Sequence, residues 1–235
     1  MFFDLCPTNE AYLADSNNEL VNCYRTIRER VSELIIYLRS IPIDEGTFYR
    51  MRSETPRCLS SVVRAARMIY LNKTCFNGLY RVNKSGRFNS PWGHWPSDKL
   101  PTVCDEENLR NCSRALQSTT IHHCDFQESC LRATPGDFVY LDPPYVPANK
   151  TSNFTSYTAD KFGPKDLEDL AETCAELSLR GVRFMLSNAD LPQTRDAFSG
   201  FRIDPIQARR SVNCKGAGRG KVGEIVVRNY GDDEC

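Results

Sequence analysis

The chain has 235 residues, of which 40% are hydrophobic and 26% charged, and its 30 basic and 30 acidic side chains cancel. Ordinary globular proteins have these proportions, so disordered and fibrous classes are excluded. No apolar stretch approaches the ~18 residues that span a bilayer, and the start MFFDLCPTNE lacks the basic and apolar segments of a secretory signal. We therefore expect a cytoplasmic protein without a membrane span, in which any basic surface is local.

Hydrophobic periodicity predicts alternating strands and helices along the chain. A short apolar run that ends on a carboxylate comes first, and the clearest helix begins at Pro164 and stops at Gly181. In chain order, the predicted elements are a strand (10–15), a helix (18–39), a region of helices and basic loops (40–101) with a helix near 59–71, a strand (136–142), a helix (164–180), a strand (182–187) and two strands that could pair (203–208 and 223–228).

This alternation indicates an α/β fold with a mainly parallel sheet. In such sheets, ligands bind at the carboxyl ends of the strands. Asp15, Asp142 and Asn188 fall at predicted strand ends. These three side chains are therefore placed where a ligand is expected.

One stretch of the chain is basic and aromatic although the total charge is zero. No acidic side chain occurs from residue 55 to residue 97, and a second basic, glycine-rich stretch covers residues 209–221. Basic side chains interleaved with aromatic rings and amides contact phosphates and bases, which favours nucleic acid as a partner. The alternative is a solvated face whose acidic partners lie elsewhere in the fold. The first stretch contains Arg57, Arg64, Arg67, Lys73, Arg81, Lys84 and Arg87, with Tyr70, Phe76, Tyr80, Phe88, Trp92 and Trp95.

Eleven cysteines are spread from Cys6 to Cys235 without a Cys-x-x-Cys pair. A disulfide framework is not expected without a secretory signal. Zinc ligands usually come as pairs about two to four residues apart, whereas the Cys and His residues of this chain are either far apart or directly adjacent. Reduced, mostly buried thiols and no metal are the preferred interpretation. The alternative is a zinc site drawn from Cys104, Cys112, His122, His123, Cys124 and Cys130.

The tetrapeptide Asp142-Pro143-Pro144-Tyr145 directly follows a predicted strand. Its two prolines fix the loop and remove two backbone donors, which leaves the Asp142 carboxylate and the Pro143 carbonyl as a rigid pair of acceptors. An exocyclic amine has two N–H donors, so this pair matches an –NH2 group, and Tyr145 can stack on the ring that bears it. Enzymes that modify a base extrude it from the duplex and hold its Watson–Crick edge. The motif therefore favours an enzyme acting on a base amine; the alternative is a proline-capped turn.

Four stretches of the chain resemble the Dam-like, D12 class of DNA N6-adenine methyltransferases, which use S-adenosylmethionine. They are residues 12–20, 70–93, 136–157 and 185–190, in the family's order. The resemblance implies a Rossmann-like S-adenosylmethionine-dependent methyltransferase fold, with a catalytic domain in two parts (1–39 and 102–235) and a mainly helical target-recognition insertion (40–101). It also implies a monomer that flips adenine out of double-stranded DNA and methylates N6 at specific sites, as restriction-modification enzymes do.

The resemblance also implies roles for individual residues. The tetrapeptide 142–145 matches the catalytic motif that holds the flipped adenine, and Asp142 also borders the cofactor. Asp15 matches the family's cofactor-binding acidic residue, and a carboxylate there suits ribose hydroxyls on chemical grounds as well. Asp125 and Phe126 resemble the pair that lines the cofactor's adenine.

The DNA contacts implied by the resemblance all lie in the target-recognition insertion. Arg81 is the candidate for a guanine in the major groove, because a guanidinium fork matches O6 and N7. The implied DNA-binding residues are Phe76, Asn77, Leu79, Arg81, Lys84, Arg87, Pro91 and Trp95.

One part of the family pattern is missing. The family opens with a lysine-containing segment, a strand and a glycine-rich loop that cradles the cofactor. In this chain, Met1 aligns with a position inside the helix that follows this loop, and the N-terminal half has no Gly-x-Gly. The missing strand would lie between the strands ending at Asp15 and Asp142, and its loss would expose two strand edges. We therefore expect an N-terminally truncated methyltransferase, arising from a misplaced start codon or a truncated gene.

Three functional hypotheses follow. Asp142, where relatives that methylate protein glutamine usually carry Asn, and the basic insertion favour an adenine-specific DNA methyltransferase. A catalytically inactive remnant would bind DNA in a salt-sensitive way without affinity for the cofactor. A zinc-dependent nucleic-acid module would carry stoichiometric metal.

Overall fold

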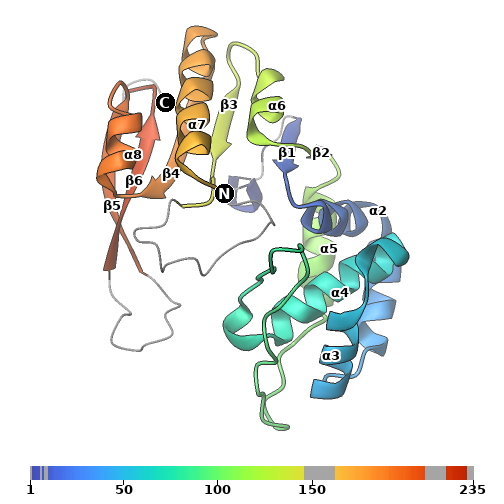
Figure 1. The fold of residues 1–235 in the computed structure, drawn as a ribbon. Helices are drawn as coiled ribbons and strands as arrows, with labels where there is room; N and C mark the ends of the chain where they lie inside the picture. Colours follow the sequence, from blue (N-terminus) through green and yellow to red (C-terminus); the bar gives the residue numbers. More distant parts are fainter. Residues whose placement is uncertain (1, 6, 8–9, 146–161, 210–220, 232–235) are drawn as a thin grey trace. The chain divides into compact units, whose positions relative to one another are not determined.

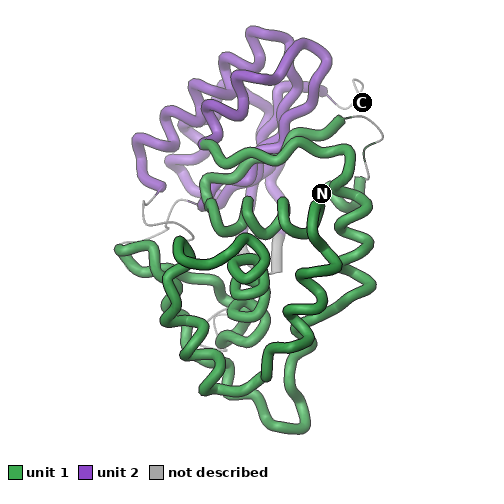
Figure 2. Tube along the Cα trace, turned by 90° about the vertical axis from the view of Figure 1, so that its right-hand side faces the viewer, with its two compact units in different colours: residues 1–124, 154–160 green, residues 125–153, 161–235 purple. Residues whose placement is uncertain are grey.

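A computed structural model describes residues 2–5, 7, 10–145, 162–209 and 221–231. The chain forms two compact units, unit 1 (residues 1–124 and 154–160) and unit 2 (residues 125–153 and 161–235) (Figure 2). Both units contain helices and strands, so the fold is mixed α/β (Figure 1). Among the described helices, none is both long enough and apolar enough to cross a membrane.

Unit 1 combines a two-stranded parallel sheet with several helices. Strand β1 (Ala11–Asp15) pairs with β2 (Thr119–His123) in a register that places Asp15 opposite His123. The helices are α1 (Phe2–Leu5), α2 (Asn18–Ser40), α3 (Glu45–Ser53), α4 (Ser61–Thr74) and α5 (Glu106–Ala115), with the short 3-10 helices η1 (Pro56–Cys58) and η2 (Phe76–Gly78).

Helix α2 supplies much of the unit 1 core. It begins after Asn17, whose side chain accepts the backbone N–H groups of Glu19 and Leu20, as a helix N-cap does. Its apolar face is buried in one cluster with side chains of α3 and α4, so the helices of the region 40–101 share a core with the preceding segment. The cluster includes Val21, Leu34, Ile35, Leu38, Phe48, Tyr70 and Leu71.

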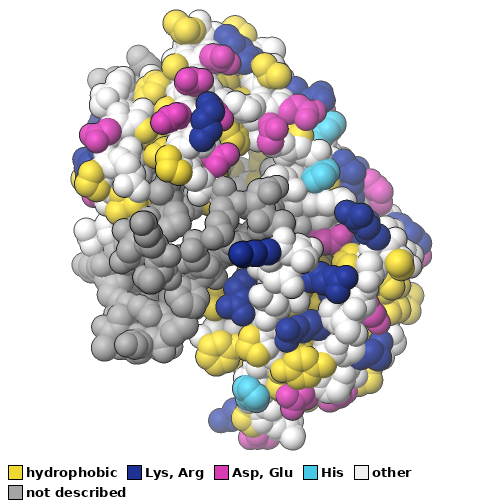
Figure 3. Space-filling view, in the orientation of Figure 1, with side chains coloured by type: hydrophobic (Ala, Val, Ile, Leu, Met, Phe, Trp, Pro, Cys, Tyr) yellow, Lys and Arg dark blue, Asp and Glu magenta, His cyan; other side chains and the backbone are white. Residues whose placement is uncertain are grey.

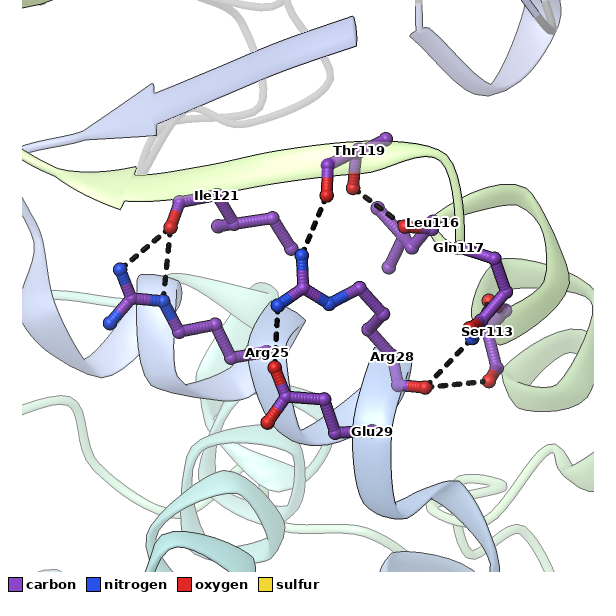
Figure 4. Close-up of polar contacts among 8 residues, drawn as sticks. All are labelled: Arg25, Arg28, Glu29, Ser113, Leu116, Gln117, Thr119 and Ile121. Carbon is purple, nitrogen blue, oxygen red and sulfur yellow. Dashed lines mark hydrogen bonds and ion pairs between the residues drawn. The ribbon is translucent and has the colours of Figure 1, made fainter. Parts of the chain in front are cut away.

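Two arginines of α2 cover the outer edge of β2 (Figure 4). Carbonyl groups alternate in direction along a strand, and the Ala11 amide bonds the carbonyl of residue 118, so the carbonyls of Thr119 and Ile121 face away from β1. Arg25 Nε and Nη2 donate to the Ile121 carbonyl at 3.0 and 2.6 Å, and Arg28 Nη1 donates to the Thr119 carbonyl at 2.6 Å. The guanidinium groups thus satisfy acceptors that an edge strand leaves unpaired.

We expect Arg25→Met to lower the free energy of unfolding by about 1 kcal/mol, because it keeps the aliphatic stem but removes both bonds to Ile121. Urea unfolding of the purified variant measures this loss. The matched control is Arg30→Met, also on α2, because Arg30 pairs with Glu33 at the exposed surface, where ion pairs contribute little. Equal destabilisation by both substitutions would show that the β2 edge does not depend on Arg25.

Unit 2 is built on a four-stranded mixed sheet with the strand order β3-β4-β6-β5. Strands β3 and β4 are parallel, whereas β6 pairs antiparallel with both β4 and β5. The core contains fully buried side chains from α7, β4 and β6, such as Leu170, Phe184 and Ile225. The elements are α6 (Phe126–Leu131), β3 (Phe138–Leu141), α7 (Pro164–Leu179), β4 (Arg183–Ala189), α8 (Pro192–Ala197), β5 (Arg202–Arg209) and β6 (Lys221–Arg228).

Every strand and helix that the periodicity predicts individually has a counterpart in the structure, and the last two strands pair as expected. The expectation of a mainly parallel sheet is wrong for unit 2, because only β3 and β4 run parallel there. The short connection 210–220 favours an antiparallel β5–β6 pair, and β6, which lies between β5 and β4, runs antiparallel to β4 as well. Strand β2 was not anticipated, because the sequence Thr-Thr-Ile-His-His has a single apolar residue.

Candidate functional site

Asp142 lies directly after β3, beside Ser187 of the adjacent strand β4. The register pairs Leu141 with Leu186, so the residues that follow are neighbours too. The Ser187 hydroxyl donates to Asp142 Oδ1 at 2.8 Å, and the Tyr140 hydroxyl lies 3.3 Å from Ser187 Oγ. Asp142 is exposed, and its Oδ2 has no hydrogen-bond partner among the described residues. The carboxylate is thus held through one oxygen and can accept a proton donor at the other.

Tyr145 is connected to another strand of the same sheet. Its hydroxyl donates to Oε2 of Glu224 in β6 at 3.3 Å. Burial raises the pKa of Tyr145 to about 12, so the hydroxyl stays protonated at neutral pH. The tetrapeptide 142–145 is therefore attached to β4 at its first residue and to β6 at its last.

Asp15, the last residue of β1, is a half-buried carboxylate in unit 1. Burial raises the pKa of Asp15, although the hydrogen bond from the Asn17 amide at 2.6 Å and the adjacent His123 both favour its ionised form. This hydrogen bond uses Oδ1, and Oδ2 has no hydrogen-bond partner in the described part of the chain. Asp15 therefore offers an acceptor at the carboxyl end of a parallel strand.

We expect Asp15→Asn to stabilise the fold at neutral pH, because an amide keeps the bond to the Asn17 amide without a buried charge. The folded-state pKa of Asp15 lies above its unfolded value of 3.8, so folding disfavours the ionised form. The full penalty acts above the folded pKa and disappears as the pH falls through it. The advantage of the variant over the wild type should therefore shrink between pH 7 and pH 4 in urea unfolding. A constant difference over this range would contradict the shift.

Asp125 and Phe126 lie at the start of α6 in unit 2. Asp125 is exposed, and its Oδ1 accepts the Glu128 amide at 2.8 Å as the helix N-cap. Phe126 is half-buried against the unit 2 core. Asp142 belongs to the same unit, whereas Asp15 belongs to unit 1. The third strand-end candidate, Asn188, is fully buried in β4.

Residues 81–89 form a short antiparallel hairpin, which we call the 81–89 hairpin. Asn89 N donates to Arg81 O and Asn83 N to Arg87 O, both at 2.9 Å. Val82 and Phe88, which face each other, are 7% and 4% exposed. Because side chains alternate along a strand, Arg81, Asn83, Arg87 and Asn89 share the opposite face. Lys84 is exposed in the connecting turn.

The other predicted DNA contacts lie around the base of this hairpin. The Phe76 amide donates to the Pro91 carbonyl at 2.9 Å, and the Phe76 ring is 43% exposed. Asn77 has φ +55°, a conformation that asparagine tolerates, and Leu79 is half-buried. The half-buried Trp95 donates its indole N–H to the Thr74 carbonyl at 2.9 Å. Trp95 therefore uses its only side-chain donor within unit 1.

The basic side chains of the stretch 55–97 have different environments. Arg67 is 5% exposed and donates to two backbone carbonyls at the end of α3. Arg64 pairs with Glu19 of α2 at 2.5 Å, as the solvated-face alternative predicts. Several Lys and Arg side chains lie on the visible face of unit 1 in Figure 3. Four of the basic side chains are exposed and have no ion-pair partner in the described ranges, namely Arg57, Lys73, Lys84 and Arg87.

Sequence reasoning did not single out Ser187, Glu224 or Asn89, although each contacts a predicted site residue. Ser187 lies within the matched stretch 185–190, so its position beside the strand end was a usable signal. Glu224 is 79 residues from its partner Tyr145, and no local pattern marks it.

The structure also describes the candidate zinc ligands and the thiols. Within the described ranges, no group of three His, Cys, Asp or Glu side chains could hold a metal ion. Cys23, Cys75 and Cys174 are buried free thiols, and the Cys130 side chain is buried as well. Burial raises the pKa of Cys23 and of Cys174 to about 12, so both stay protonated at neutral pH.

Comparison with known proteins gives consistent matches along the chain. The model of the D12 class N6 adenine-specific DNA methyltransferase family matches residues 1–212. The type II methyltransferase M1.LlaDCHI of Lactococcus lactis subsp. cremoris is 38% identical over 99% of this chain and 83% of its own length. The DNA adenine methylases of Serratia marcescens and Escherichia coli (strain K12) are 33% and 30% identical, over 93% and 92% of this chain and 82% and 77% of their own lengths. The chain therefore belongs to the D12 class of N6 adenine-specific DNA methyltransferases.

Proposed function

We propose that this chain transfers a methyl group from S-adenosylmethionine to N6 of an adenine that has been flipped out of duplex DNA, with Asp142 as the acceptor for the adenine amine. The observation that carries the proposal is the exposed carboxylate of Asp142, directly after β3, whose Oδ1 accepts a hydrogen bond from the Ser187 hydroxyl at 2.8 Å. An acceptor fixed in this way can orient an amine without rearranging during the reaction.

Asp142 and Pro143 act on the adenine amine. The amine has two N–H groups, which match the Asp142 carboxylate and the Pro143 carbonyl. On methyl transfer, N6 would gain a bond to the methyl carbon as the carbon–sulfur bond of the donor breaks, and the nitrogen would become positively charged. The carboxylate stabilises this charge and accepts one N6 proton. Ser187 leaves Asp142 Oδ2 available for this proton because it occupies Oδ1.

Tyr145 is assigned to stacking on the flipped adenine. A flipped base loses its neighbours in the duplex, and an aromatic ring replaces part of that stacking. The bond to Glu224 restricts the Tyr145 ring, and its raised pKa keeps the hydroxyl as the donor in that bond.

The residues assigned to the cofactor fit a nucleoside in their chemistry. Asp15 has a carboxylate oxygen without a partner among the described residues, suited to ribose hydroxyls. Asp125 is exposed, and Phe126 offers an aromatic ring next to it. S-adenosylmethionine, when bound, supplies an activated methyl group on a positively charged sulfur. Asp15, Asp125 and Phe126 would hold its nucleoside, and Asp142 would border it.

The proposal includes a Rossmann-like methyltransferase fold. Within the described residues, β1 pairs only with β2 and β3 pairs only with β4. Each of these strands is therefore an edge. Strand β1 ends on Asp15, and β3 is followed directly by Asp142, which are both predicted site carboxylates. A parallel strand added to either edge would satisfy the unpaired backbone groups of that edge.

The test is transfer of labelled methyl from S-adenosylmethionine to unmethylated duplex DNA by the 235-residue chain. We expect N6-methyladenine when the DNA is digested to nucleosides and analysed by mass spectrometry. If the chain is inactive and gains activity when a strand and glycine-rich loop are added before it, the reaction stands and the added elements are needed for it. If both forms bind DNA but neither transfers methyl, the proposed activity is wrong and the inactive remnant is the better description.

A further inference from the structure

The face of the 81–89 hairpin that carries Arg81 also carries Asn89, directly across the hairpin. Arg81 Nε donates to Asn89 Oδ1 at 2.7 Å, and Arg81 Nη2 donates to the Asn89 carbonyl at 3.4 Å. The Asn89 amide in turn donates to the Arg81 carbonyl at 2.9 Å. One residue therefore holds both the backbone and the guanidinium of Arg81.

These bonds use one particular edge of the guanidinium. The group has five N–H donors in a plane, and a base or phosphate can meet it along the Nε–Nη2 edge or across the Nη1–Nη2 end. Asn89 occupies the Nε–Nη2 edge. Nη1 has no hydrogen-bond partner among the described residues. The end formed by Nη1 and the second Nη2 proton is therefore the part left to a ligand.

The hairpin itself is closed by further hydrogen bonds. Asn83 Oδ1 accepts the amides of Ser85 and Arg87 at 2.9 and 3.0 Å, and the Gly86 amide donates to the Asn83 carbonyl at 2.9 Å. Gly86 has φ +70°, which glycine adopts without strain. Val82 and Phe88 fix the other face by burial. The guanidinium is thus held on a backbone that has little freedom to move.

We propose that Asn89 is a specificity-determining positioning residue, which holds Arg81 so that the Nη1–Nη2 end of its guanidinium meets O6 and N7 of a guanine. This inference rests on the proposed function, because it takes Arg81 as a base contact in the target DNA. Two donors at fixed spacing match the two guanine acceptors, and this pairing discriminates among bases only when the guanidinium plane is fixed. Without Asn89, the same charge can turn toward phosphates, which carry no sequence information.

The proposal predicts that base preference and overall affinity respond to different substitutions at position 89. Asn89→Ala removes the Oδ1 acceptor and keeps the charge of Arg81, so the guanine preference should fall roughly 10-fold while the mean affinity for DNA changes little. Asn89→Asp keeps an acceptor for Nε and adds a negative charge. This variant should retain the guanine preference and bind all duplexes more weakly.

The experiment measures binding of the 235-residue chain to a library of randomised duplexes, for the wild type and both variants. Lys84→Ala is the matched control in the same hairpin, and it should weaken binding evenly without changing the base preference. Circular dichroism melting confirms that each variant is folded.

An unchanged guanine preference in Asn89→Ala would overturn the proposal, and so would a loss of preference in Asn89→Asp as large as in Asn89→Ala. If the wild type shows no guanine preference at any position, Arg81 is not a base contact and the proposal falls with that assignment. Failure of the proposed reaction would appear separately, as absence of methyl transfer to duplexes that the wild type binds.

Discussion

Asp142→Ala is expected to lower the rate of methyl transfer by about 10³-fold or more, while the affinity for DNA stays within a few-fold of the wild type. The substitution removes the only carboxylate of the tetrapeptide, and with it the acceptor that we propose for the N6 proton. Binding to the rest of the duplex is unaffected, because it depends on phosphate and base contacts made elsewhere. Single-turnover methyl transfer measures the rate, and a DNA titration measures the affinity. Both are made in a form of the enzyme that is active when residue 142 is Asp.

Substitutions of Ser187 test whether the orientation of Asp142 matters as well as its charge. Ser187→Ala removes the bond to Asp142 Oδ1, and we expect the rate to fall roughly 10-fold, as the loss of one hydrogen bond to a charged group implies. Ser187→Thr retains a hydroxyl and should preserve most of the rate. A near wild-type rate for Asp142→Ala itself would show that another group accepts the adenine amine.

Arg81→Ala is expected to relax the sequence preference of the enzyme at one base pair, at a cost of about 1–3 kcal/mol in discrimination. The effect should be confined to one position of the target, because a single guanidinium end spans a single guanine. Methylation of a library of duplexes, read out by sequence, gives the preference at each position.

The matched control for Arg81→Ala is Arg87→Ala. This substitution removes the same charge from the same face of the hairpin. The Arg87 side chain, however, is exposed and has no fixed partner among the described residues. It should weaken binding to all duplexes to a similar degree. If Arg81→Ala behaves in the same uniform way, Arg81 contacts phosphate rather than a base.

Local patterns were sufficient to predict most individual elements. Helix α2 follows from apolar residues at helical spacing and begins at a capping asparagine, and α7 begins at Pro164 and is followed by Gly181. These signals come from residues within one or two turns of each other, so they can be recognised without knowing the fold. The pairing of β5 with β6 was predictable for the same reason, because a short connection favours antiparallel neighbours.

The environment of the site residues was not predictable in this way. Ser187 lies 45 residues from Asp142, and Glu224 lies 79 residues from Tyr145. These contacts depend on the register of β3 with β4 and of β4 with β6. A shift of one residue in either register would turn Ser187 or Glu224 to the opposite face of the sheet. Register is set by packing of the whole sheet, which no short stretch of sequence contains.

The sequence by itself determined the chemistry of this protein: a carboxylate and a tyrosine separated by two prolines, a basic aromatic segment, and the order of strands and helices that carry them. The tertiary structure alone decided how those groups are held. It placed Ser187 on Asp142 and Glu224 on Tyr145, and it directed Asn89 toward Arg81. The physical reason is that residue type fixes which donors and acceptors exist, whereas their distances arise from strand register and core packing, which are properties of the folded chain as a whole.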